Sequence, residues 1–274
     1  MVGNRHVDRL APDKCRYADS HTHLDRYPAA VVARMVRTAR AAGVCDVLVV
    51  GIDAASSARA LRLARRHRGL TAAAGLHPQS ADDGFARELA AVRALLAGDD
   101  PRLRAVGEAG LDRTVAAPLA LQRRAFAAQL ALAVEFRRAV VVHSVGAHAE
   151  VAAMLADVAA QLPAVIIHYF TGERHELARF LALGCLISFG RLILKPGQEA
   201  LRALVPLVPA DRLLAETDTY PLPGRTTEPS GVVDVVQRLA RLRGEDAAVT
   251  ARHTRANFRR ALGLATDREG LLSC

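Results

Sequence analysis

The sequence is poor in aromatic residues. Tryptophan is absent, and aromatic side chains make up 4% of the 274 residues, which argues against an aromatic stacking platform for sequence-specific nucleic-acid recognition. No apolar run approaches the roughly 18 residues of a transmembrane helix, and segment 1–10 lacks the apolar core of a signal peptide. The composition, 51% hydrophobic and 24% charged, excludes a disordered or collagen-like chain. We therefore expect a soluble, cytoplasmic protein without a membrane partner.

Cysteine and lysine are also scarce. No CxxC spacing, which would indicate a zinc ribbon or a redox pair, occurs among Cys15, Cys45, Cys185 and Cys274. We expect Cys45 and Cys185 to be core residues in a reducing compartment. Lys14 and Lys195 are the only lysines, so the net charge of +9 comes from arginine. Many arginines recur at helical spacing, which is typical of solvated helix faces, and charge alone does not identify a nucleic-acid binder.

What the sequence does contain is an alternation of short apolar segments with longer amphipathic ones. The apolar segments predict strands at 17–24, 46–51, 71–76, 104–107, 139–143, 164–168, 185–189 and 212–216. The amphipathic segments predict helices at 29–42, 55–67, 85–97, 118–136, 148–161, 174–183, 197–204, 232–242 and 246–262.

Eight strands separated by helices imply a parallel sheet, because parallel neighbours need a crossover connection. Eight such units over about 250 residues favour a (β/α)8 barrel of the TIM type, with an open doubly wound sheet as the alternative. No linker or change of composition divides the chain. We therefore expect one barrel domain over residues 17–265, an N-terminal extension over 1–16 and a C-terminal tail over 266–274.

Polar residues end six of the predicted strands, which is where barrel enzymes carry their active sites. His21 and His23 are two apart on a strand and share a face, so both can bind one metal ion. A lone histidine after an apolar run is more often a hydrogen-bonded core residue, but the recurrence at six strand ends favours a metal site. The end residues are His21, His23, His77, Glu108, Asp112, His143, His168, Glu216 and Asp218. The remaining histidines assessed, on helices or in the extension, are expected at the surface: His6, His67, His175 and His253.

The types of ligand in this set limit which metal ions the site could bind. Imidazoles and carboxylates without a thiolate suit zinc, manganese or iron, and magnesium less well. The set is too large for one tetrahedral shell, so two ions that share a bridging carboxylate are plausible. We expect one or two divalent ions, with zinc, manganese and magnesium as the candidates.

Eight motifs in this order resemble the TatD family of metal-dependent hydrolases, which belongs to the amidohydrolase-like barrels. They are residues 19–25 (DSHTHLD), 75–78 (GLHP), 106–112 (VGEAGLD), 122–129 (QRRAFAAQ), 140–144 (VVVHS), 168–172 (HYFTG), 187–190 (ISFG) and 216–218 (ETD). The resemblance implies a DNase-like enzyme in which metal-activated water attacks a phosphodiester, with DNA as the default substrate.

The resemblance also assigns roles. It implies that His21, His23 and Asp218 hold the first ion, that His143 and His168 hold the second, and that Glu108 bridges them. Asp218 would in addition accept a proton from water, which makes Asp218 and Glu108 the expected catalytic residues. His77 would contact substrate, Asp112 would support a ligand, and Glu216 and Thr217 would be supporting residues. No obligate protein partner is evident from the sequence, and we expect a monomer.

Two departures from the family pattern concern the substrate loops. The family usually has arginine and an acidic residue after the VVVHS motif, where this chain has Val145 and Gly146. The loop after Asp218 is shortened. Because valine offers no hydrogen-bond donor, a phosphodiester would rely on the ions, on His77 and on Arg191 or Arg225 from neighbouring loops. An apolar wall at Val145 would suit a less charged substrate. A small-molecule hydrolase acting on an amide, lactone or phosphomonoester is therefore the alternative function, and a catalytically silent metal-binding scaffold is a third.

Overall fold

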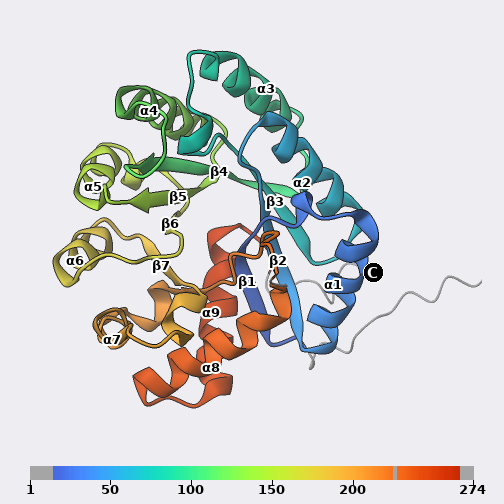
Figure 1. Cartoon of the computed structure of the whole chain (residues 1–274), viewed down its shortest axis with the longest axis vertical. Helices are drawn as coiled ribbons and strands as arrows, with labels where there is room; N and C mark the ends of the chain where they lie inside the picture. Colours follow the sequence, from blue (N-terminus) through green and yellow to red (C-terminus); the bar gives the residue numbers. More distant parts are fainter. Residues whose placement is uncertain (1–14, 225–226, 266–274) are drawn as a thin grey trace, which may run out of the picture.

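The computed structural model describes residues 15–224 and 227–265 and contains an eight-stranded parallel barrel surrounded by helices (Figure 1). The strands pair in sequence order, from β1 with β2 through β7 with β8. A single parallel bridge between Thr22 and Thr219 joins the end of β1 to the segment after β8 and closes the circle. The predicted (β/α)8 fold is confirmed, and the open sheet is wrong.

The strands lie close to their predicted positions. Their bounds are β1 Tyr17–Thr22, β2 Val44–Val50, β3 Leu70–Ala74, β4 Leu103–Asp112, β5 Ala139–Val145, β6 Val165–Ile167, β7 Leu186–Phe189 and β8 Leu213–Ala215. The helices are α1 Ala29–Ala41, α2 Ala54–Arg66, α3 Phe85–Ala97, α4 Leu119–Glu135, α5 His148–Ala156, α6 Arg174–Ala182, α7 Glu199–Arg202, α8 Val232–Arg243 and α9 Ala247–Ala261. Short 3-10 turns follow several strands, among them η3 Pro78–Ser80, η5 Arg191–Leu194 and η8 Pro229–Gly231.

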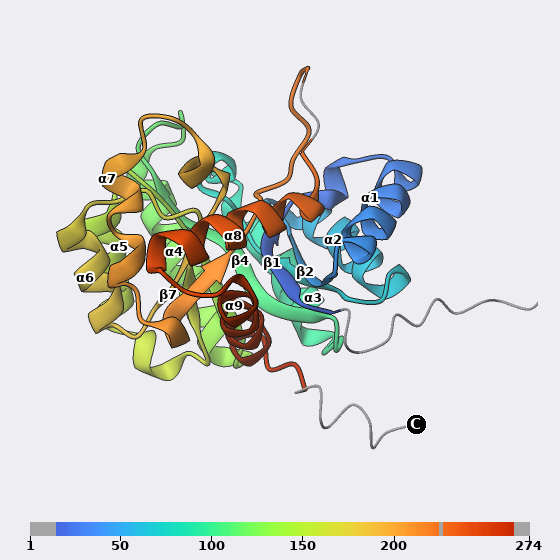
Figure 2. The same ribbon diagram turned by 90° about the horizontal axis from the view of Figure 1, so that it is seen from below.

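Apolar side chains fill the barrel interior at the amino-terminal end of the strands. One buried cluster combines inward side chains of every strand, such as Leu48, Val141 and Leu214, with Phe258 and Leu262 from the C-terminal part of the chain. Helix α9 therefore covers the amino-terminal end of the strands (Figure 2). A separate, larger cluster packs the outer strand faces against the surrounding helices. The carboxyl ends of the strands are left for polar side chains.

Strand β4 is the main departure from the predicted elements. It was expected to end at Gly107 and instead continues to Asp112. Its pairing with β5 slips between Val106 and Ala109, so that two residues of β4 face one residue of β5. Such a β-bulge turns a side chain that regular alternation would direct elsewhere. The bulge contains Gly107 and Glu108, which the sequence pattern could not distinguish from a strand end.

Cys45, which we expected in the core, is only partly buried. It forms a disulfide with Cys15, with the two Cα atoms 5.4 Å apart. The bond is possible because β1 and β2 are neighbours and Tyr17 pairs with Val44. A disulfide is unusual in a reducing compartment, so this pairing does not support that expectation. Cys185 is buried and free, as predicted.

No helix in the described ranges is both long and apolar enough to cross a membrane. The predicted extension, apart from Cys15 and Arg16, and the tail at 266–274 lie outside the described residues.

Candidate active site

All eight predicted site residues meet at the carboxyl ends of the strands. His21 lies within β1 and His23 directly follows it, His77 follows β3, Glu108 and Asp112 belong to β4, and His143 belongs to β5. His168 follows β6, and Asp218 follows β8 by three residues. The barrel brings together side chains from six strand ends that are up to 197 positions apart in the chain, which is the arrangement expected of an active site in this fold.

Glu108 occupies the centre of the site. Its side chain is 3% exposed, and its two oxygens face different histidines. Oε2 lies 3.3 Å from His21 Nε2 and 3.4 Å from His23 Nε2. Oε1 lies 2.7 Å from His143 Nδ1 and 2.9 Å from His168 Nε2. One carboxylate therefore stands between two pairs of imidazoles.

Hydrogen bonds at the far ring nitrogens of His23, His143 and His168 fix which nitrogen of each ring faces Glu108 with a lone pair, whereas His21 Nδ1 is buried and forms no hydrogen bond among the described residues. His23 Nδ1 donates to the carbonyl of Val50 at 2.9 Å, so in the neutral ring the Nε2 lone pair points toward Glu108. His143 Nε2 lies 2.9 Å from Asp112 Oδ2, and His168 Nδ1 lies 3.1 Å from Glu216 Oε1. These carboxylates accept hydrogen bonds, which again leaves the other nitrogen's lone pair toward Glu108.

Facing lone pairs repel unless a cation or a proton lies between them. His21 Nε2 and His23 Nε2 are 3.2 Å apart, and both face the same carboxylate oxygen. His143 Nδ1 and His168 Nε2 are also 3.2 Å apart and both face the other oxygen. The donors of His21, His23 and Glu108 lie within 4.8 Å of one another, as do those of His77, Glu108 and His143, and of His21, His168 and Glu216. The donor set therefore fits divalent metal ions on both sides of Glu108.

Electrostatics keep the central carboxylate ionised. Burial alone would raise the pKa of Glu108, but the imidazoles of His168, His77 and His21 outweigh burial and hold this pKa well below its usual range. Burial would likewise raise the pKa of Asp218, whereas its hydrogen bond to His23 and the nearby imidazoles lower the pKa to about 2. Both carboxylates are therefore anions at neutral pH.

His77 faces the site with a hydrogen-bond donor. Its Nδ1 accepts from the backbone N–H of Gln79 at 3.1 Å, so the proton of the neutral ring is on Nε2. That nitrogen lies 3.6 Å from Glu108 Oε1. Desolvation lowers the pKa of His77 to about 4, so the ring is neutral at pH 7. A neutral ring with its N–H directed into the site can donate to a substrate oxygen.

Asp218 depends on a hydrogen-bond network that the sequence did not reveal. Its backbone has φ +48°, a strained conformation for a non-glycine residue. The N–H of Asp218 donates to the His21 carbonyl at 3.0 Å. The preceding Thr217 donates to Asp19 twice, from its N–H at 2.9 Å and from Oγ1 at 2.6 Å. Asp19 is fully buried and therefore ties the Asp218 segment to β1.

The sequence could have indicated that the Asp19 side chain lies near the site, because Asp19 stands two residues before His21 and shares its strand face. It could not indicate that Asp19 accepts hydrogen bonds from Thr217, since Thr217 is 198 positions away. Asp218 lies 3.5 Å from His23 but belongs to none of the three compact donor sets found among the described residues.

Close backbone approach shapes β4 beside the site. Gly110 pairs with His143 and has φ +153°. A Cβ atom at this position would lie 1.9 Å from the His143 carbonyl oxygen. Only glycine lets β4 approach β5 closely enough to place Glu108 and His143 together.

The residues that depart from the family pattern lie at the mouth of the site. Val145 ends β5, pairs with Asp112 and is partly buried. Gly146 is exposed, with the carbon chain of Arg113 beside it. Arg191 is close to Asp218, because its Nε donates to the Thr217 carbonyl at 2.9 Å. Arg225 lies outside the described residues.

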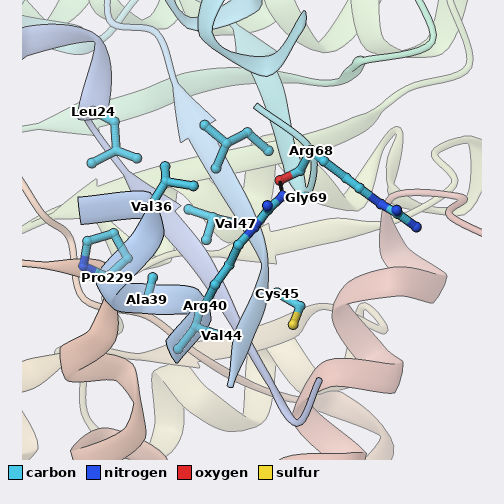
Figure 3. Close-up of a pocket in the computed structure, with 11 residues that line it drawn as sticks. Leu24, Val36, Ala39, Arg40, Val44, Cys45, Val47, Arg68, Gly69 and Pro229 are labelled. Carbon is cyan, nitrogen blue, oxygen red and sulfur yellow. Dashed lines mark hydrogen bonds between the residues drawn. The ribbon is translucent and has the colours of Figure 1, made fainter. Parts of the chain in front are cut away.

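A small pocket on the outer side of the barrel is separate from this site (Figure 3). Its lining is mainly apolar, with Leu24, Val36 and Pro229 among the contributors, and includes Arg40, which donates to the Arg68 carbonyl. It shares no residue with the eight site residues.

The barrel and its histidine–carboxylate centre are those of a metal-dependent hydrolase. Residues 18–263 match the family model described as TatD related DNase. The 3'-5' ssDNA/RNA exonuclease TatD of Erwinia tasmaniensis is 40% identical over 245 residues, which cover 84% of this chain and 93% of that protein. The corresponding exonuclease of Erwinia amylovora is also 40% identical, with the same coverage.

Solved structures agree with the family match. YjjV, a TatD homologue from Escherichia coli, superposes with a TM-score of 0.85 at 29% identity and covers 92% of this chain and 100% of its own. A TatD family hydrolase from Entamoeba histolytica has the same fold, with a TM-score of 0.76 at 14% identity over 90% of this chain and 98% of its own. The chain belongs to the TatD family of DNase-related hydrolases.

Proposed function

We propose that this protein hydrolyses phosphodiester bonds of nucleic acid with two divalent metal ions. His21, His23 and Asp218 would hold the first ion, His143 and His168 would hold the second, and Glu108 would contact both. The observation that carries the proposal is the position of Glu108, which presents one carboxylate oxygen to each histidine pair. The printed names of relatives, which are 3'-5' ssDNA/RNA exonucleases, support a nucleic-acid substrate.

The ions would stabilise negative charge that develops on the phosphate and would activate water. With four imidazoles, two carboxylates and no thiolate, the donor set favours zinc or manganese over magnesium. Paired ions are a known arrangement for displacing groups at phosphorus with water.

The chain's own residues would orient the substrate and move the proton. Asp218 is ionised and partly exposed, so it is placed to accept a proton from the attacking water. His77 would donate its Nε2–H to a phosphate oxygen. Asp112 and Glu216 would hold His143 and His168 with their lone pairs toward the centre, while Asp19 keeps the Asp218 segment in place.

The deciding experiment is a substrate panel with the metal-loaded protein. Single-stranded DNA, RNA, phosphomonoesters, amides and lactones are compared after reconstitution with zinc, manganese or magnesium. We expect DNA or RNA cleavage that chelation abolishes and that Glu108→Gln reduces about 100-fold or more. Glu135→Gln, which changes an exposed glutamate paired with Arg93, is the matched control. Turnover of an amide or lactone with no phosphodiester cleavage would establish the small-molecule alternative instead.

A further inference from the structure

Two tyrosines and an arginine gather beside Asp218 at the mouth of the site. Tyr169 directly follows His168 after β6, Arg191 begins the turn after β7, and Tyr220 stands two residues after Asp218. All three are partly exposed. They follow β6, β7 and β8, which are neighbours in the sheet, so the parallel pairing of these strands brings them together at one end.

Tyr169 is held in an unusual conformation. Its backbone has φ +43°, which is strained for an aromatic residue. The next residue, Phe170, donates its N–H to the Ser188 carbonyl at 2.9 Å. The Tyr169 ring lies on Gly190, where a Cβ atom would be 2.2 Å from its Cε2. The ring is therefore packed against the residue before Arg191.

Arg191 is fixed at one nitrogen and open at the others. Its Nε–H donates to the Thr217 carbonyl at 2.9 Å, which holds the guanidinium next to Asp218. Within residues 15–224 and 227–265 it forms no ion pair, unlike many arginines of this chain. The two terminal nitrogens remain as donors, in the fork geometry that suits a phosphate group.

Tyr220 lies beside His23, which in turn contacts Asp218. Its ring is 6.4 Å from that of His23, edge to face at 72°. The pKa of Tyr169 also reflects the closeness of these groups. Desolvation, followed by the charges of Asp218, Glu216 and Tyr220, raises this pKa to about 12, whereas Arg191 acts in the opposite direction. Two partly exposed tyrosine side chains and a guanidinium are the elements of a single-stranded nucleic-acid site.

We propose that Tyr169, Arg191 and Tyr220 form a subsite for the single-stranded nucleotide next to the scissile bond. Arg191 binds the neighbouring phosphate, and the two tyrosine rings stack on bases. This proposal rests on the proposed nuclease function and specifies its substrate, because a base must be unpaired to stack on a protein ring in this way. Arg191 also supplies the guanidinium that Val145 does not.

The test separates binding from cleavage. Binding of a labelled single-stranded dT decamer is measured by fluorescence anisotropy in EDTA, where no turnover occurs. Cleavage of the same decamer with manganese is compared with cleavage of methyl p-nitrophenyl phosphate, a diester without bases or a second phosphate. The variants are Arg191→Gln, Tyr169→Leu and Tyr220→Leu, with Tyr169→Phe and Tyr220→Phe as conservative partners. Arg93→Gln, at an exposed ion pair on the helices, controls for the loss of one positive charge.

We expect each disruptive variant to raise the Kd for the decamer about 10-fold, while both phenylalanine variants and Arg93→Gln stay near wild type. Arg191→Gln should also reduce the slope of log Kd against log salt by about 0.7. Cleavage of the small diester should fall several-fold less than cleavage of the decamer in each disruptive variant.

Three results would overturn the inference. Unchanged decamer binding in the disruptive variants would remove the subsite and leave the nuclease function intact. A parallel loss on the small diester would show that these side chains shape the metal centre instead of binding the neighbouring nucleotide. Failure of the folded, metal-loaded wild type to cleave either phosphodiester would reject the proposed function, and the subsite with it.

Discussion

Replacing Asp112 by asparagine tests the histidine orientation on which the metal centre depends. Asp112 Oδ1 accepts two hydrogen bonds from Thr114, from its N–H at 2.7 Å and from Oγ1 at 2.5 Å. Oδ2 lies 2.9 Å from His143 Nε2. In the variant the amide oxygen must face the two Thr114 donors, so the amide NH2 faces His143. His143 then accepts at Nε2 and carries its proton on Nδ1, the nitrogen that faces Glu108.

The expected cost follows from that change of tautomer. A protonated Nδ1 cannot bind a metal ion, and loss of such a supporting carboxylate typically lowers metal affinity 10- to 100-fold. That corresponds to about 1.4–2.7 kcal/mol. Asp112→Ala removes the contact without imposing the wrong tautomer. We therefore expect asparagine, the more conservative change, to weaken metal binding more than alanine does.

Metal affinity is measured by titration against a competing chelator, and the tautomer of His143 is read from its imidazole nitrogen shifts. Far-ultraviolet circular dichroism and thermal melting of the metal-free proteins control for folding. Wild-type affinity in Asp112→Asn, or a weaker effect than in Asp112→Ala, would refute the reasoning.

Four further predictions follow from the structure. Removing the metal should lower the Tm by about 5–10 °C for each ion that was present at 100 times its Kd, since the binding of one ion at that concentration contributes about 2.7 kcal/mol. An unchanged melting curve would contradict a metal centre. Val145→Arg should raise kcat/KM on single-stranded DNA about 10-fold. Val145 pairs with Asp112 at the mouth of the site, and a charge-assisted hydrogen bond from arginine to a phosphate contributes about 1.5–3 kcal/mol. Strong native activity that this change leaves unaltered would show that the position is irrelevant. Gly110→Ala should lower the free energy of unfolding in urea by about 3 kcal/mol or more. The control Gly184→Ala, whose added Cβ meets no atom within 4 Å, should lower it by about 1 kcal/mol. Equal losses would refute the clash between Gly110 and the His143 carbonyl. Asp19→Ala should lower the free energy of unfolding by about 2–4 kcal/mol and reduce kcat, because the N–H and Oγ1 of Thr217 lose the two carboxylate oxygens that accept their hydrogen bonds. Full activity in the folded variant would show that Asp218 does not depend on the contact between Thr217 and Asp19.

The order of the elements was determined by the sequence alone. Apolar strands and amphipathic helices carry periodicities that are local, so the eight strands and the barrel they form could be predicted within a few residues. The convergence of the eight predicted site residues could be expected for a related reason. Parallel strands of a barrel end on the same side, so polar residues that end different strands, such as His21 and His168, must meet.

Only the tertiary structure decided how those residues face one another. The bulge that places Glu108 between two histidine pairs depends on the register of β4 against β5. The disulfide of Cys15 and Cys45 depends on strands that are neighbours in space. The same holds for Thr217 with Asp19, 198 positions apart. Contacts of this kind leave no periodic or spacing signal in the chain, because each is set by barrel closure rather than by local sequence.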